Sequence, residues 1–284
     1  MAEVALLEQG IERGKEWGAE APLFPLILHY DVCETHENIK RNLRQTLESE
    51  YVPFNALLAE PHDREISIVG FGPSLKKTWK QLRGDLMVTN GAHDWLIERG
   101  IIPKYAMFFD ASDVMTKFVN PHPDVTYLVA SRCSRGIFNA LKGHKVYVWH
   151  GMGDDYLDDF LCEFRKAEPM LGGGTAAVTR GMMVATNMGY RKINLFGADS
   201  SFEGKFTHVN ESIVPEKIIT VWCNGRKFKS TSWLCGQVED FKILHPLMKK
   251  MGCTLEVYGD GLLPHVAKIN GYAVHNSTVE ETNV

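Results

Sequence analysis

Several features are absent from this sequence, and each absence argues against a class of protein. No apolar run approaches the roughly 20 residues that a helix needs to span a bilayer. Residues 1–20 alternate charged with small apolar side chains, so they do not resemble a secretory signal peptide. The six cysteines form no C-x-x-C pair, which disfavours a zinc site or a disulfide framework and indicates buried, reduced thiols. We therefore expect a cytoplasmic protein without a membrane segment.

A basic excess is also missing. The chain has 31 lysines and arginines against 35 aspartates and glutamates, so its net charge at pH 7 is -4. Proteins that bind duplex nucleic acid usually carry a basic net charge or a basic stripe. Net charge therefore does not indicate nucleic acid as a partner, although a local groove can be basic on an acidic protein.

The remaining composition is that of an ordinary globular protein. With 44% hydrophobic and 23% charged residues, the collagen-like, coiled-coil and disordered classes are excluded. A length of 284 residues is enough for one large α/β domain or two small ones. No internal repeat and no linker rich in Gly, Pro or Ser divides the chain.

The residue pattern divides the chain into three parts. Residues 1–60 predict a helical N-terminal appendage, in which Ile39, Leu43 and Leu47 lie on one face of a helix. Residues 61–270 are the predicted nucleotide-binding catalytic domain. Residues 271–284 are polar, and we expect them to form a frayed tail.

Short apolar runs alternate with helical segments through most of the predicted catalytic domain. The predicted strands cover residues 66–69, 86–90, 105–110, 125–130, 146–149, 193–196 and 254–258. Such alternation forms βαβ units, so the expected fold class is α/β, a Rossmann-like and mostly parallel sheet with helices on both faces. A C-terminal β-hairpin, with Asn224 and Gly225 in a type I′ turn, is followed by a predicted helix over residues 233–251.

The first strand-to-helix turn is a candidate nucleotide loop, because ligands of such sheets bind beyond the carboxyl ends of the strands. It contains Gly70, Phe71, Gly72, Pro73, Ser74 and Leu75. The glycines allow close backbone approach, Pro73 suits a first helical turn, and a helix start offers free N–H groups to a phosphate. A tight turn without a ligand is the alternative. If the turn binds phosphate, Gly72→Val should abolish nucleotide binding while the fold survives.

A second glycine tract also precedes a helix. Gly172, Gly173, Gly174 and Thr175 follow one another, and successive glycines lose much backbone entropy on folding. A ligand pressed against this backbone would explain the tract, and a flexible connector would explain it equally well.

Polar side chains end other predicted strands. Asp199 follows one of them, and His208 lies nine residues further on. A carboxylate in that position can hold a divalent cation, orient a sugar or ribose hydroxyl, act as a base, or cap the next turn. Asp110 and Asp113 invite the same interpretations, and Asn90 ends the neighbouring strand.

Taken together, these segments resemble a known superfamily. Residues 70–75 match its G-x-G-P-S-L nucleotide loop, and residues 172–190 resemble its G-G-[ST]-V helix with the closing L-G-[FY]. Residues 193–208 resemble its I-x-L-x-G-x-D segment with the following G-K-x-[TS]-H, and residues 237–241 and 259–264 also fit. The chain is identified as a member of the superfamily that joins the archaeal 6-hydroxymethylpterin pyrophosphokinase (MptE)-like proteins with the bacterial motility-associated-factor glycosyltransferases. This superfamily is related to the family 42 sialyltransferases.

The resemblance implies a glycosyltransferase that uses a nucleotide-sugar donor, with a CMP-activated nonulosonic acid favoured. The two glycine tracts would hold the nucleotide phosphate, and Asn90 and Asp110 would contact the ribose or base. His208 and Asp199 would face the sugar and acceptor, His208 as a base or as a stabiliser of the leaving phosphate. Because Phe71, Ala198 and Ser200 depart from the usual residues of the superfamily, the identity of the acceptor does not transfer.

Two alternatives stay open. A diphosphokinase would move pyrophosphate from ATP to a pterin hydroxymethyl group, and its Mg²⁺ would bind Asp110 and Asp113, with Asp199 as a further candidate. Otherwise no cofactor is implied. A nucleotide-binding module without catalysis is the second alternative. A compact member of the superfamily also suits a phage-encoded modifier of DNA or of a surface glycan, but the sequence identifies neither the acceptor nor the oligomeric state.

Overall fold

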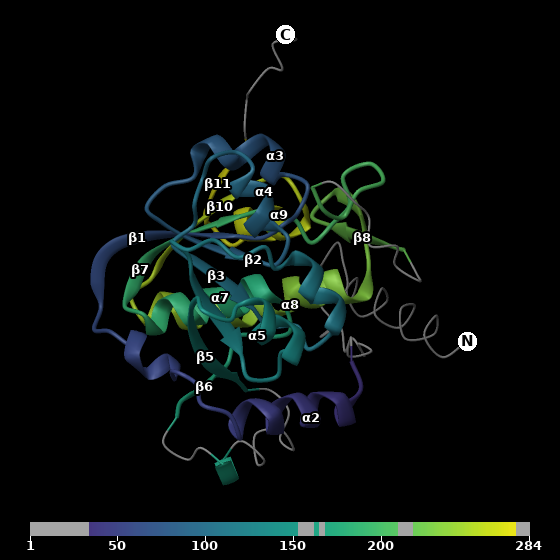
Figure 1. The fold of residues 1–284 in the computed structure, drawn as a ribbon. Helices are drawn as coiled ribbons and strands as arrows, with labels where there is room; N and C mark the ends of the chain where they lie inside the picture. The colour runs from purple at the N-terminus through teal and green to yellow at the C-terminus, as the bar shows by residue number, and fades with distance from the viewer. Residues whose placement is uncertain (1–33, 153–161, 165–167, 210–217, 277–284) are drawn as a thin grey trace.

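The computed structural model describes residues 34–152, 162–164, 168–209 and 218–276 (Figure 1). Its strands are β1 (His62–Val69), β2 (Asp85–Thr89), β3 (Tyr105–Phe108), β4 (Thr126–Ala130), β5 (Lys145–Gly151), β6 (Met170–Leu171), β7 (Tyr190–Phe196), β8 (Ile219–Cys223), β9 (Arg226–Ser230), β10 (Thr254–Tyr258) and β11 (Ala273–His275). Its α-helices are α2 (His36–Leu47), α3 (Leu75–Thr78), α4 (Ala92–Ile97), α5 (Arg135–Ala140), α7 (Ala177–Asn187), α8 (Ser232–Lys250) and α9 (Leu262–Ile269). Short 3₁₀ turns are η1 (Phe54–Leu57), η2 (Trp79–Gln81) and η3 (Asp113–Phe118).

One nine-stranded sheet organises the chain, in the order β11-β10-β7-β1-β2-β3-β4-β5-β6. Every neighbouring pair in it is parallel. The central strands are buried on both faces, as Ile66, Ile68 and Val69 of β1 show with no exposed surface. Continuous apolar runs are typical of parallel strands that helices cover on both sides, and the α/β prediction is confirmed.

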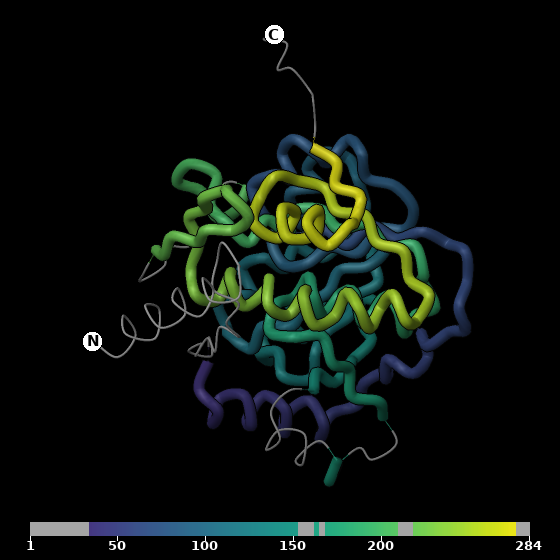
Figure 2. Tube along the Cα trace, turned by 180° about the vertical axis from the view of Figure 1, so that it is seen from behind, coloured from purple at the N-terminus to yellow at the C-terminus, as the bar shows by residue number. Residues whose placement is uncertain are grey.

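The helices cover the two faces of the sheet in an order that follows from chain direction. Strands β1 to β5 follow one another toward one edge of the sheet, whereas β7, β10 and β11 follow one another toward the opposite edge. Right-handed crossovers therefore place α3, α4 and α5 on one face and α7, α8 and α9 on the other. In agreement, α8 packs against both α7 and α9, and the rear view shows α8 and α9 in front (Figure 2).

The predicted hairpin is present as a separate two-stranded antiparallel sheet, β8 with β9. Asn224 and Gly225 have φ angles of 44° and 76°, and positive φ at both central residues is what a type I′ turn requires. The predicted long helix begins directly afterwards as α8, where the Thr231 side chain accepts a hydrogen bond from the Leu234 N–H at 3.2 Å.

The two ends of the described chain differ in how well the sequence predicted them. Ile39, Leu43 and Leu47 of α2 are buried as expected, and the remainder of the predicted appendage, residues 1–33, lies outside the described residues. The tail predicted from residue 271 is wrong for residues 273–275, because they form the edge strand β11 beside β10. His275 stacks on Tyr258 there, with ring centroids 4.6 Å apart. Among the described helices, none has the length and apolar character needed to cross a membrane.

Candidate functional site

The carboxyl end of β1 is the point where the sheet changes its direction of growth. The chain continues from β1 to β2 on one side, whereas β7 lies on the other side. Open α/β sheets bind ligands in the crevice above such a topological switch point. The predicted segments after β1, β7 and β10 all leave the sheet here.

The glycines of the first turn are required by the neighbouring strand. Gly70 and Gly72 donate their N–H groups to the carbonyl oxygens of Phe196 and Gly197, each at 2.8 Å. A Cβ added at Gly72 would lie 2.2 Å from Asp199 Oδ2 and 2.6 Å from the Gly197 oxygen. These distances are well inside van der Waals contact, so no side chain fits at Gly72 while the two loops stay packed together. The expectation that Gly72→Val leaves the fold intact is therefore wrong.

The N–H groups expected to meet a phosphate are largely used within the protein. Besides those of Gly70 and Gly72, the Ser74 N–H donates to Asp199 Oδ2 at 3.0 Å, and Pro73 has no N–H. The following helix, α3, has only four residues. A phosphate at this turn would need donors from elsewhere, and the role of the turn in phosphate binding stays a prediction.

Asp199 is buried between the turns after β1 and β10. Asp199 is only 5% exposed, and its burial raises the pKa of the carboxyl group to about 6. The Ser74 N–H opposes this rise, while the carboxylates of Glu203 and Asp260 add to it. A carboxyl group with a pKa near 6 can take up or release a proton close to neutral pH.

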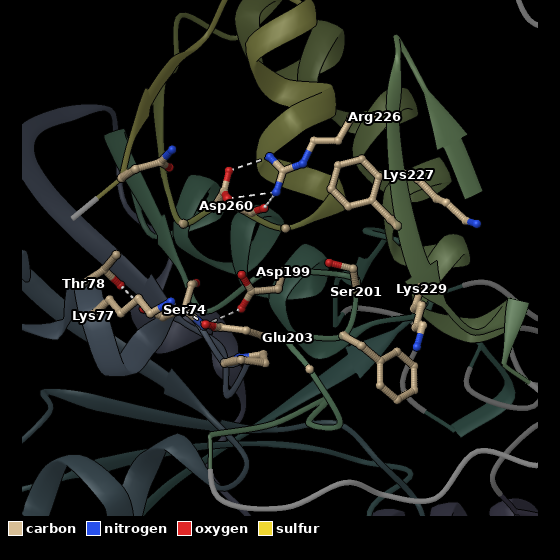
Figure 3. Close-up of a pocket in the computed structure, with 17 residues that line it drawn as sticks. Ser74, Lys77, Thr78, Asp199, Ser201, Glu203, Arg226, Lys227, Lys229 and Asp260 are labelled. Atoms are coloured by element: carbon tan, nitrogen blue, oxygen red, sulfur yellow. Dashed lines mark hydrogen bonds and ion pairs between the residues drawn. The ribbon is translucent and has the colours of Figure 1, made fainter. Parts of the chain in front are cut away.

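A cavity of about 480 Å³ opens above Asp199. Its walls come from α3 and the turn before it, the loop after β7, strand β9 and the loop after β10 (Figure 3). Arg226 of β9 holds Asp260 through two hydrogen bonds of 2.6 and 2.8 Å, and Lys77 pairs with Glu203 across the other side. The Arg226 guanidinium lowers the pKa of Asp260, which therefore stays ionised.

A second cluster lies on the β2 side of the same turn. The Phe71 ring packs on Gly91, where a Cβ would come within 2.8 Å of it, and His208 lies with its ring centroid 6.0 Å from that of Phe71. The Val209 N–H donates to the Phe71 carbonyl oxygen at 3.0 Å. His208 therefore lies beside the candidate loop, but it does not line the cavity above Asp199, with which it was expected to face the sugar.

Asn90, at the end of β2, has two unusual features. Its φ is 50°, a left-handed conformation that non-glycine residues seldom adopt, and its Oδ1 is buried without a hydrogen-bond partner among the described residues. Buried polar atoms are nearly always satisfied, and strained backbone concentrates at functional sites. The Asn90 Oδ1 atom is therefore a candidate ligand contact.

The Asp240 carboxylate of α8 packs against the second glycine tract. A Cβ added at Gly174 would lie 2.1 Å from Asp240 Cγ, and Thr175 donates to Asp240 Oδ2 from its N–H at 2.7 Å and its hydroxyl at 2.9 Å. Gly173 and Gly174 have φ angles of 130° and 83°. Neither interpretation made from the sequence, a ligand or a flexible connector, is needed to explain these glycines.

Helix α8 also ties down the loop after β7, because the Ser200 hydroxyl donates to Gln237 Oε1 at 2.8 Å. The sequence showed residues 237–241 as a motif, but it did not show that Gln237 holds the loop after β7 or that Asp240 holds the second glycine tract. Helix α7, which follows the tract, begins at Ala177 without a side-chain cap, and Val178 in its first turn packs on Gly70. Uncapped N–H groups thus start close to the first turn.

Asp199 lies apart from the other two predicted Mg²⁺ ligands, Asp110 and Asp113. Asp110 Oδ1 accepts the Ser112 N–H at 2.9 Å, which closes a local turn, and Asp113 is exposed at the start of η3. Asp199 follows β7, three strand positions away from β3, or about 14 Å along the sheet edge. Within the described ranges, no group of three or more His, Cys, Asp or Glu side chains could hold a metal ion.

Two comparisons place the chain among known proteins. The family model described as 6-hydroxymethylpterin diphosphokinase MptE-like matches residues 37–205, more than half of the chain. A structure titled as the MAf glycosyltransferase from Magnetospirillum magneticum AMB-1 superposes with a TM-score of 0.60 at 12% identity. The superposition covers 90% of this chain but only 40% of that one, and it shows a shared fold. A search of curated proteins returned no match.

Proposed function

The chain belongs to the 6-hydroxymethylpterin diphosphokinase MptE-like family, and from that premise we propose that it is a glycosyltransferase with a nucleotide-sugar donor. The donor would be a CMP-activated nonulosonic acid or a similar sugar. Its nucleotide would bind beside Asn90 and Phe71, and its sugar would reach the cavity above Asp199. The likeness in fold to a MAf glycosyltransferase supports transfer of a sugar.

The observation that carries the proposal is the buried Oδ1 of Asn90, which has no hydrogen-bond partner among the described residues, just before the Gly91 on which the Phe71 ring packs. An asparagine amide offers one acceptor and two donors, so it can pair with the hydrogen-bonding edge of a pyrimidine or with ribose hydroxyls. Phe71, held on Gly91, and the His208 ring supply flat surfaces beside it. The strain at Asn90 is then part of a preformed base or ribose site.

The phosphate of the donor would meet the start of α7 and His208. The first N–H groups of α7 have no side-chain cap, and they start beside Gly70. His208, whose Nδ1 lies 3.0 Å from Thr207 Oγ1, can either accept a proton or carry one toward the departing phosphate. These two roles require opposite protonation states.

Sugar transfer forms a bond between an acceptor oxygen and the anomeric carbon, breaks the bond from that carbon to the phosphate oxygen, and releases CMP. The acceptor hydroxyl must lose a proton. Asp199 is suited to receive it, because burial has raised the pKa of this carboxyl group toward neutrality and the side chain lines the cavity floor. Ser74 fixes the orientation of Asp199 through its N–H.

Pyrophosphate transfer is the second candidate, because the matching family is described as a diphosphokinase. That reaction uses Mg²⁺ on carboxylates. Asp199 lies three strand positions from Asp110, so the three candidate carboxylates would not share one ion, and Asp110 already accepts the Ser112 N–H. Transfer of a sugar is therefore the better supported reaction.

A thermal-shift screen distinguishes the two candidates. A ligand present at 100 times its Kd stabilises the folded state by about 2.7 kcal/mol. We expect CMP and CDP to raise the Tm without Mg²⁺, and ATP to have little effect. A Tm rise that needs both ATP and Mg²⁺ would contradict the glycosyltransferase and support the diphosphokinase. If no nucleotide changes the Tm, the protein lacks the proposed nucleotide site, which also contradicts the proposal.

A further inference from the structure

Basic side chains gather around the mouth of the cavity above Asp199. Four of them line the cavity, Lys77 of α3 with Arg226, Lys227 and Lys229 of β9, and Lys76 and Lys205 are chain neighbours of the lining residues Lys77 and Gly204. Two of these side chains form ion pairs with acidic residues, Lys77 with Glu203 and Arg226 with Asp260. A chain with a net charge of -4 therefore presents a locally basic arc, the cavity rim.

Aromatic rings are interleaved with these lysines. Trp222 is 65% exposed, and the Lys227 ammonium lies 5.7 Å from the centroid of its ring. Phe206, two residues beyond the lining residue Gly204, has the ammonium groups of Lys76 and Lys205 within 5.4 and 5.3 Å of its ring centroid. Rings that alternate with lysines offer stacking surfaces and counter-charges to the same ligand.

The hairpin does not need Trp222 for its own packing. Strand register places Trp222 opposite Lys227 and Thr220 opposite Lys229, and all four residues are exposed. The inner face of the hairpin carries the buried Phe228, and Arg226 anchors the hairpin to the loop after β10. The outer face is thus a rigid and exposed platform that combines a ring with two cations.

The spacing and location of the rim favour one kind of partner. Lys227 and Lys229 are alternate residues of a strand, so their Cα atoms lie about 7 Å apart, which is comparable to successive phosphates of an extended strand. Stacking on Trp222 and Phe206 needs bases that are already unpaired. A base within a duplex also cannot enter a cavity whose floor is the buried Asp199, because it would first have to leave the stack.

We propose that the cavity rim docks single-stranded nucleic acid, with its phosphates on Lys227 and Lys229 and a base stacked on Trp222. If the chain is the proposed glycosyltransferase, the docked strand also supplies the acceptor hydroxyl; the docking itself does not depend on that function. The rim then presents one nucleotide of the strand to the cavity above Asp199.

Fluorescence anisotropy with a labelled oligothymidylate of about 12 nucleotides tests the proposal on the full chain. We expect saturable binding at low salt that weakens as salt is raised. Trp222→Ala should raise the Kd at least about fivefold, because it removes a stacked base. The double variant Lys227→Gln/Lys229→Gln should raise the Kd about tenfold and flatten the salt dependence.

The matched control is Lys249→Gln/Lys250→Gln, which removes the same charge from exposed residues at the far end of α8. It should bind like the wild type. The proposal is overturned by no saturable binding, by equal affinity for a duplex of the same length, or by equal losses in the control. It is also overturned if an anionic polysaccharide binds as tightly and Trp222→Ala changes nothing, since the rim would then recognise a glycan or charge alone.

CMP binding, measured on the same proteins, separates this inference from the proposed function. The rim variants should retain the CMP-induced rise in Tm. Wild-type protein that binds the oligonucleotide but not CMP would refute the donor site and leave the docking surface standing. Protein that binds CMP but not the oligonucleotide would refute the docking surface alone.

Discussion

Gly72→Ala is the substitution for which the structure predicts the largest effect from a single added carbon. The new Cβ would be placed 2.2 Å from Asp199 Oδ2 and 2.6 Å from the Gly197 carbonyl oxygen. Backbone cannot yield as a flexible side chain can, so the loops after β1 and β7 must separate. Overpacking of this kind costs about 1–3 kcal/mol, and loss of the hydrogen bond from Gly72 to Gly197 adds about 1 kcal/mol.

The expected total is about 2–4 kcal/mol, which corresponds to a Tm lowered by roughly 3–7 °C in a chain of this size. Thermal unfolding followed by circular dichroism measures it. Gly172→Ala is the matched control, because the nearest atom to its added Cβ would lie 3.9 Å away. Equal Tm values for the two variants would refute the conclusion that close packing of two loops requires Gly72.

Three other substitutions test the roles assigned to the site. Because burial raises the pKa of Asp199 to about 6, the folded protein binds this proton more tightly than the unfolded chain does. As the pH rises from below 4 to above 6, the wild type should therefore lose up to about 3 kcal/mol of stability, about 2 kcal/mol of it between pH 4 and pH 6. Asp199→Asn should lack this loss and turn over at least about tenfold more slowly, and identical stability profiles would contradict the assignment. His208→Gln should lower turnover about 10²-fold and flatten one limb of the pH–rate profile, and an unchanged profile at similar rates would show that His208 is not catalytic. Asp240→Ala should lower stability by about 1–2 kcal/mol, since the Thr175 N–H and hydroxyl lose their acceptor. Chemical denaturation of Asp240→Ala beside Glu239→Ala, an exposed-face neighbour paired with Lys242, measures it, and equal stabilities would count against the role of Asp240.

Much of the fold could be predicted because strands and helices leave periodic patterns. The runs that became β1 to β5, β7 and β10 are short and mostly apolar, and the Asn224-Gly225 turn has one favoured geometry. Strands β6 and β11 have two and three residues, too few to show a period. Helix α9 was missed because its start was recognised only as part of a motif that contains Pro264.

The site could be predicted only in part, because a sequence shows which residues are unusual and not what approaches them. The glycines at positions 70, 72 and 174 were expected to let another group approach the backbone, and the groups that do so in the structure are Gly197, Asp199 and Asp240. These partners lie more than 60 residues away in the chain. The same limit applies to the cavity above Asp199, to which β9 contributes a wall that no local pattern connects with the turn after β1.

In the proposed glycosyltransferase, a nucleotide binds beside Asn90 at the switch point of the sheet. Isothermal titration of CMP into the wild type and Asn90→Ala tests it most directly. Asn224→Ala is the control, because Asn224 has the same left-handed backbone, with φ of 44°, in the hairpin turn. We expect Mg²⁺-independent CMP binding that Asn90→Ala weakens at least about tenfold, as for loss of one to two buried hydrogen bonds, while Asn224→Ala binds like the wild type. Equal CMP affinity in all three proteins, or no binding by the wild type, would contradict it.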